Sequence, residues 1–88
     1  MDTRLLGTFL AVAETGSVTQ AARALGYTQP AVSRQVAALE HLLGGRLFDR
    51  SHQPLALTPF GSSIYPHARA TLLLIDDLLV LVSRQRMR

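Results

Sequence analysis

The sequence has no cysteine and no long apolar run, and both absences exclude classes of protein. Without cysteine the chain forms neither disulfides nor thiolate metal sites, and a reducing cytoplasm is its natural compartment. The longest apolar segment, LLLIDDLLVLV at 72–82, carries two aspartates and is far shorter than the roughly 20 residues that span a bilayer. The N-terminus also lacks the basic region of a secretory signal. We therefore expect a soluble, cytoplasmic protein.

Lysine is absent as well, so all nine basic side chains are arginines, against six carboxylates. The net charge is +3 and the sequence pI is near 10.6, which is compatible with a polyanionic partner such as nucleic acid. The excess is modest, and arginine usage can equally reflect a GC-rich coding background. The charge supports a nucleic-acid partner without deciding it.

Patterns typical of enzymes and metal sites are missing from the sequence. The three histidines, His41, His52 and His67, lie far apart, and there is no His-x-x-x-His, Gly-x-Ser-x-Gly or phosphate-binding glycine loop. Asp76 and Asp77 are adjacent, so on a helix their side chains point about 100° apart and do not form an acid–base pair. We expect no enzymatic activity, no metal and no cofactor.

Two short helices are predicted in the first quarter of the chain. Apolar residues at helical spacing run from Leu5 to Ala13, and Gly16 is a plausible stop. Ser17 and Gln20 then form a Ser-x-x-Gln capping box in front of a second helix at about 18–25. Gly26 ends that helix, because glycine adopts the left-handed conformation of a sharp helix exit without steric cost.

A third helix is expected directly after this turn. Thr28 or Gln29 caps it, and Pro30 falls in the first turn, where a missing N–H is harmless. Its apolar residues are Val32, Val36, Leu39 and Leu43. The pair Gly44-Gly45 stops it.

The rest of the sequence predicts a small hairpin and one long helix. Short extended segments at 47–50 and 55–58 flank the turn-prone residues 51–54, and Pro54 confines its strand to an edge. Thr58-Pro59 is a strong helix start, and Pro66 is a point where the following helix can bend. The predicted fold class is mainly α with a small β-hairpin, divided into residues 1–58 and a helix at 59–88.

The tight turn between the second and third helices suggests a helix-turn-helix, in which the second of two steeply crossed helices enters the DNA major groove. Ala21 and Ala22 allow close helix contact, Gly26 makes the turn, and apolar packing is expected from Leu25, Tyr27 and Val32. The alternative is an ordinary helical hairpin of a small bundle.

A helical wheel separates the two sides of the third helix. At ~100° per residue, the apolar residues cluster on one side, Ser33 lies on the flank, and the opposite side carries Pro30, Arg34, Ala37 and His41. Arg34 could donate to guanine O6 and N7 or bind a phosphate, whereas Ser33 and Gln29 suit base edges. The alternative for Arg34 is a solvated helix arginine; together with the motif, DNA is favoured.

A set of residues along nearly the whole chain strongly resembles the N-terminal DNA-binding domain of LysR-type transcriptional regulators. These residues are Phe9, Gly16-Ser17, Ala21-Ala22, Leu25, the run TQPAVSRQV, Leu39-Glu40, Leu47-Phe48, Arg50 and the run LTPFG. The resemblance implies a winged helix-turn-helix followed by a long linker helix that dimerises. It also implies sequence-specific binding of double-stranded DNA by a bacterial regulator, which acts in the cytoplasm at the nucleoid as a homodimer on a pseudo-palindromic operator.

The resemblance also implies roles for individual residues. It implies that Gln29, Pro30, Ser33 and Arg34 lie at the DNA, with Thr28 near the start of the recognition helix. Arg50 on the wing would contact a backbone phosphate. The wing tip departs from the family, which often has further arginines or glycines there, so its binding to DNA is expected to be weaker or to depend on His52.

Family members also carry a larger C-terminal domain for a small-molecule co-inducer. That domain is absent here, so a fragment or a truncated regulator is expected.

The long helix has apolar side chains on more than one side between Leu72 and Val82, so burial by a partner is expected. The same helix of a second chain would cover one side. The stripe predicted to dimerise is Ile64, Ala68, Leu72, Ile75, Leu79 and Val82. Alternatives are packing of this helix on its own helix-turn-helix, a protein-docking module without DNA binding, or a molybdate-sensing or MarR-like winged-helix regulator.

Overall fold

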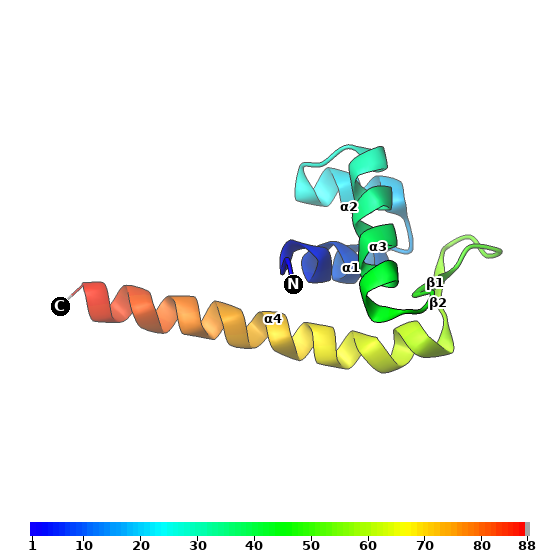
Figure 1. Ribbon diagram of the computed structural model, residues 1–88. Helices are drawn as coiled ribbons and strands as arrows, with labels where there is room; N and C mark the ends of the chain where they lie inside the picture. Colours follow the sequence, from blue (N-terminus) through cyan, green and yellow to red (C-terminus); the bar gives the residue numbers. More distant parts are fainter. Residues whose placement is uncertain (88) are drawn as a thin grey trace.

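A computed structural model describes residues 1–87 and shows three short helices, a two-stranded hairpin and one long helix (Figure 1). The molecule is elongated, with extents of 52 × 26 × 19 Å. This confirms the predicted class, mainly α with a small hairpin. Position 88 of the predicted last helix lies outside the described residues. The elements are α1 (Arg4–Thr15), α2 (Val18–Leu25), α3 (Gln29–Leu43), β1 (Phe48–Asp49), β2 (Ala56–Leu57) and α4 (Pro59–Arg86).

The start of α2 uses only half of the predicted capping box. The backbone N–H of Gln20 donates to the Ser17 hydroxyl at 3.1 Å, as expected of an N-cap. The Ser17 N–H, however, donates to the Thr15 hydroxyl oxygen at 3.3 Å instead of to the Gln20 side chain. The last turn of α1 therefore replaces the second half of the box.

The start of α3 shows which of the two candidate residues, Thr28 or Gln29, caps this helix. The hydroxyl of Thr28 accepts from the Ala31 N–H at 3.3 Å, while Gln29 is the first helical residue. Pro30 follows in the first turn, as predicted. The Gln29 side chain is consequently free of a capping role and is exposed.

The turn between α2 and α3 depends on Gly26, whose φ of 73° lies in the left-handed region that favours glycine. Ala21 and Ala22 are buried, so the two helices approach closely there. Of the three residues expected to pack at this turn, Val32 is fully buried, whereas Leu25 and Tyr27 are only partly covered, at 36% and 37% exposure.

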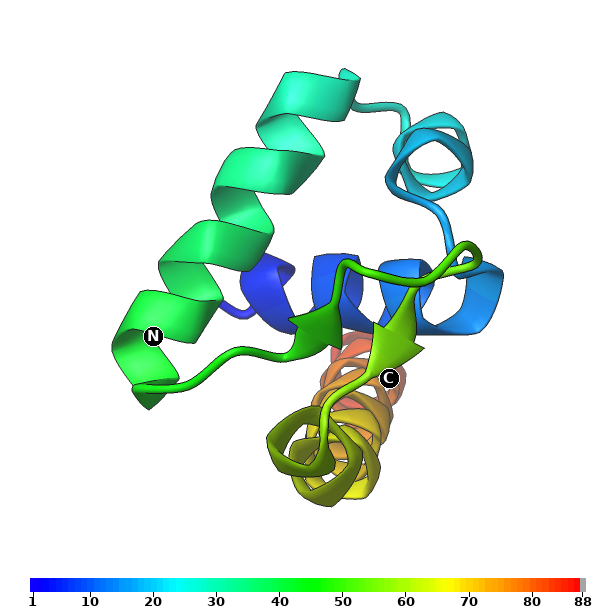
Figure 2. The ribbon, with the colours of Figure 1, turned by 90° about the vertical axis from the view of Figure 1, so that its right-hand side faces the viewer.

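Helix α1 lies between the α2–α3 pair and α4, and it provides the centre of the core (Figures 1 and 2). The fully buried ring of Phe9 makes edge-on contacts with Phe48, at a centroid distance of 5.6 Å, and with Tyr65, at 6.2 Å. These contacts join α1, the hairpin and α4 in one core. Edge-to-face aromatic pairs contribute about 0.5–1.5 kcal/mol beyond the area they bury.

The hairpin is shorter than predicted. Its ladder holds two antiparallel residue pairs, Phe48 with Leu57 and Asp49 with Ala56. The Leu55 N–H donates to the Gly16 carbonyl oxygen at 2.9 Å instead of to the opposite strand. This bond ties the hairpin to the end of α1 and limits the ladder to two residues per strand.

Helix α4 continues through Pro66 as one element and changes its surroundings halfway along. Ala68 is buried, and Ile64 and Leu72 pack against the same core. Beyond this point the helix extends away from the rest of the chain (Figure 1). Within residues 1–87, no helix combines the length and apolarity needed to cross a membrane. The distal half of α4, residues 73–86, exposes large apolar side chains at Leu73, Leu74, Leu78, Leu79, Val80, Leu81 and Val82.

Candidate nucleic-acid interface

The outer side of α3 carries the residues that the helical wheel placed there. Val32, Val36 and Leu39 are buried against the core and fix the rotation of the helix. As a result the opposite side faces solvent. The exposed residues are Thr28, Gln29, Pro30, Arg34, Ala37 and His41, with Ser33 half-buried on the flank.

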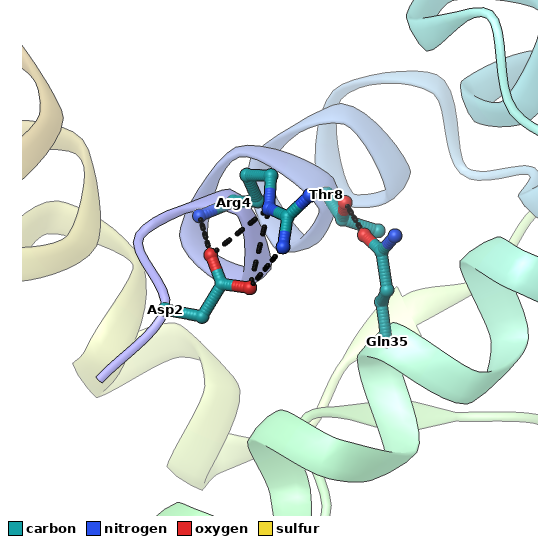
Figure 3. A network of polar contacts seen from close by, with 4 residues as sticks. All are labelled: Asp2, Arg4, Thr8 and Gln35. Carbon is teal, nitrogen blue, oxygen red and sulfur yellow. Dashed lines mark hydrogen bonds and ion pairs between the residues drawn. The ribbon is translucent and has the colours of Figure 1, made fainter.

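A partly buried polar contact adds to the apolar packing that holds α3. The hydroxyl of Thr8, on α1, donates to the side-chain oxygen of Gln35 (Figure 3). Thr8 is 1% exposed, and Gln35 follows Arg34 directly in sequence. A partly buried hydrogen bond restricts the relative placement of its two partners. It therefore fixes the rotation of α3 next to its exposed arginine.

An exposed ion pair neutralises the arginine at the start of α1 (Figure 3). The Arg4 Nη2 atom lies 2.9 Å from a carboxylate oxygen of Asp2. Hydrogen bonds from the Arg4 side chain and backbone lower the pKa of the Asp2 carboxyl. Arg4 therefore contributes less positive charge to the outer surface than an unpaired arginine would.

A notch of about 300 Å³ lies between the starts of α2 and α3 and the wing, which we define as residues 46–58. It brings together three predicted DNA contacts, Gln29, Ser33 and Arg50. Arg34 does not line it. Its walls also include residues to which the sequence analysis gave no DNA contact: Ser17, Val18, Thr19, Gln53 and Leu55. Only the hydroxyl of Ser17 had a sequence signal, and that signal indicated a helix cap.

The two predicted wing residues have different surroundings. Arg50 lines the notch, and its side chain is 47% exposed. His52 stands in the turn and is 66% exposed, with Nε2 3.6 Å from Asp49 Oδ2. Asp49 was not predicted as part of this surface. Hydrogen bonds from the Ser51 hydroxyl and N–H lower the pKa of the Asp49 carboxyl, so it places a negative charge beside His52.

Glu40 is a further residue that the sequence analysis did not assign to the site. It lies near the C-terminal end of α3, is 9% exposed, and faces Arg46 and Arg50. Its sequence signal is that it falls one helical turn after the buried Val36, where a carboxylate is unusual. No pattern in the sequence indicated which arginines it would face.

The predicted dimerisation stripe divides into a covered and an open part. Ala68 is 4% exposed and belongs to the chain's own core. Ile64 and Leu72 also pack on that core, because α1 covers this side of α4. Leu79 and Val82 are exposed, and Ile75 is half-buried.

Within residues 1–87, no three histidine, aspartate or glutamate side chains gather closely enough to hold a metal ion. The polar groups on the exposed side of α3 are hydroxyl, amide, imidazole and guanidinium groups. These groups donate hydrogen bonds to phosphate oxygens and to base edges.

Comparison with known proteins identifies a family. Residues 3–62 match the family model described as bacterial regulatory helix-turn-helix protein, lysR family. An HTH-type transcriptional regulator from the ibpB-leuC intergenic region of Azotobacter vinelandii is 47% identical over 77 residues, covering 88% of this chain and 54% of the relative. The regulator ClcR of Pseudomonas putida is 44% identical over 72 residues, covering 82% of this chain and 24% of ClcR. The chain thus spans about half of the first relative and a quarter of the second.

Solved structures agree with this match. The DNA-binding domain of BenM, in complex with benA site 1 DNA, superposes with a TM-score of 0.91 at 38% identity, covering 96% of this chain and 94% of that one. The DNA-binding domain of CbnR, also in complex with DNA, gives a TM-score of 0.88 at 40% identity and covers all of both chains. The winged helix-turn-helix fold is therefore shared along the whole described chain.

Proposed function

The chain belongs to the lysR family of bacterial regulatory helix-turn-helix proteins, and on this premise we propose that it binds double-stranded DNA sequence-specifically and regulates transcription as a homodimer. Its site of action would be the nucleoid in the cytoplasm. A small-molecule co-inducer would act through a C-terminal domain outside this chain. The observation that carries the proposal is the exposed side of α3, held in one orientation by the core on its other side.

Base recognition is assigned to the first half of α3. Pro30 and Ala37 make its outer surface flat, which suits insertion into the major groove of B-DNA. Arg34 is exposed there, and its guanidinium has the geometry to donate two hydrogen bonds to guanine O6 and N7. Gln29 and Ser33, on the same turn of the helix, are assigned to neighbouring base edges, and Thr28 to the backbone at the helix start.

Backbone contacts are assigned to the wing and the notch. Arg50 lies where the notch meets the wing, close enough to the helix for one duplex to contact both. Phosphate contacts position a protein on DNA without selecting a sequence. His52 can add a further contact at the tip, although the ionised Asp49 beside it repels phosphate.

Dimerisation is assigned to the distal half of α4. Its exposed leucines and valines form an apolar surface larger than a solvated helix normally carries. The interface is proposed for Ile75, Leu79 and Val82, extended by the neighbouring Leu78, while Leu72 lies at its edge. A two-fold pair would present two recognition helices to half-sites about 10 base pairs, or a multiple of that, apart.

The experiment that tests DNA binding compares two arginine variants on specific and unrelated duplexes. Arg34→Ala should weaken specific binding by roughly 1–3 kcal/mol and relax selectivity at one base pair. Arg50→Ala should weaken all sequences similarly and lower the slope of log affinity against log salt by about 0.9. If the wild-type chain shifts no duplex at low salt, the proposal is wrong.

A further inference from the structure

Glu40 is a nearly buried carboxylate whose position is fixed by the backbone of the wing. Its Oε2 atom accepts a hydrogen bond from the Leu47 N–H at 2.8 Å. Leu47 is itself fully buried, so this bond ties the end of α3 to the residue at which the wing enters the core. The carboxylate therefore has little freedom to move.

The same carboxylate faces two arginines of the wing, Arg46 and Arg50. Oε1 lies 3.6 Å from Nη2 of Arg50, and Oε2 lies 3.9 Å from Nε of Arg46. The Arg46 side chain is 70% exposed, whereas that of Arg50 is 47% exposed and lines the notch beside Gln29. Arg50 is thus held between a fixed carboxylate and the candidate DNA surface.

We propose that Glu40 is a positioning residue that holds the Arg50 guanidinium at the notch, ready to bind a DNA backbone phosphate. This inference rests on the proposed function. A guanidinium has five N–H donors in a rigid plane, so an Nη2 directed toward Glu40 leaves donors for a phosphate. A long side chain loses rotamer entropy when it is immobilised, and a fixed partner reduces that loss on binding.

The sign of the effect distinguishes positioning from simple repulsion. A carboxylate close to DNA repels phosphates, so removing its charge would by itself strengthen binding. If Glu40 acts by placing Arg50, removing its charge weakens binding instead. The two roles therefore predict opposite changes in affinity.

The test uses Glu40→Gln, which keeps the shape and an oxygen to accept from the Leu47 N–H while removing the charge. We expect about a two- to fivefold loss of affinity for all duplexes, because the arginine of this ion pair is half exposed to solvent. The slope of log affinity against log salt should shift toward that of Arg50→Ala. In the Arg50→Ala background, Glu40→Gln should have no further effect. Glu14→Gln makes the same charge change at an exposed glutamate of α1 and leaves the Glu40–Arg50 pair in place, so it should cause no loss.

Two results of this cycle would overturn the inference: tighter binding by Glu40→Gln, or an equal loss with and without Arg50. A wild-type chain that binds no duplex contradicts the proposed function itself, which is a separate outcome. A second measurement needs no variant. NMR relaxation of the Nε–H groups should show Arg50 more restricted than the exposed Arg84 at the end of α4, and equal mobility would contradict the positioning role.

Discussion

The compact part of the molecule, residues 1–72, and the distal half of α4, residues 73–86, contain the same types of apolar side chain but use them differently. In the compact part, Phe9, Leu39 and Leu47 are fully buried by neighbours from the same chain. On the distal helix, Leu74 and Leu79 are 68% and 59% exposed. The first region completes its own core, whereas the second leaves an apolar surface that residues 1–87 do not cover. Stability should therefore depend on the first region and association on the second.

The largest expected effect comes from breaking the compact core. Phe9→Ala removes the ring that contacts both Phe48 and Tyr65, and buried Phe→Ala changes cost about 3–5 kcal/mol. Because a domain of this size has a stability of about 5–15 kcal/mol, we expect a large fall in the free energy of unfolding. Urea unfolding followed by circular dichroism measures it. Leu42→Ala, at an exposed leucine of α3, should change stability by less than about 0.5 kcal/mol.

The next effect separates association from folding. Leu79→Glu places a charge in the proposed interface and should weaken dimerisation at least about tenfold, or 1.4 kcal/mol. Leu73 has similar exposure but lies about 120° away around α4. Leu73→Glu is therefore the matched control. Sedimentation should find monomers only for Leu79→Glu, with helical content unchanged in both; dimers that persist in Leu79→Glu would refute the interface.

A smaller effect is expected at the polar contact between α1 and α3. Thr8→Val keeps the shape but removes the donor to Gln35, which should cost about 0.5–1.5 kcal/mol of stability. Thr71→Val is the control, because the Thr71 hydroxyl donates to the His67 carbonyl on the exposed side of its own helix. Thermal unfolding compares them. Equal losses in the two variants would show that the Thr8 hydroxyl has no special role.

The smallest effect concerns the wing alone. The Ser51 hydrogen bonds favour the ionised Asp49, so its folded-state pKa lies below the unfolded value. The stabilisation is present above the unfolded pKa, near 3.8, and is lost as pH falls through the folded pKa. NMR titration of the Asp49 carboxyl should show this lowered pKa, and Ser51→Ala should raise it toward the ordinary value. A pKa unchanged by Ser51→Ala would contradict the assignment.

Local features of the sequence predicted most of the fold. The limits of α2 and α3 follow from Ser17, Gly26 and Thr28, whose effects act within a few residues along the chain. The outward side of α3 followed from helical periodicity, which also acts locally. These predictions needed no knowledge of what lies opposite each element.

Features that depend on distant parts of the chain could not be predicted. The link from Thr8 to Gln35 joins residues 27 positions apart, and Glu40 meets Arg50 only because the wing folds back. Ala68 was assigned to the dimer stripe because of its spacing, and the structure buries it in the chain's own core. Periodicity identifies an apolar side of a helix without identifying what buries it.

Selection of bound sequences from a random duplex pool tests the central claim most directly, namely that the compact part recognises DNA and the distal half of α4 pairs two copies. The wild-type chain should enrich two related half-sites in inverted orientation at fixed spacing. Leu79→Glu should enrich single half-sites with the same base preference. A wild-type pool with no enriched sequence, or with unpaired half-sites only, would contradict the account.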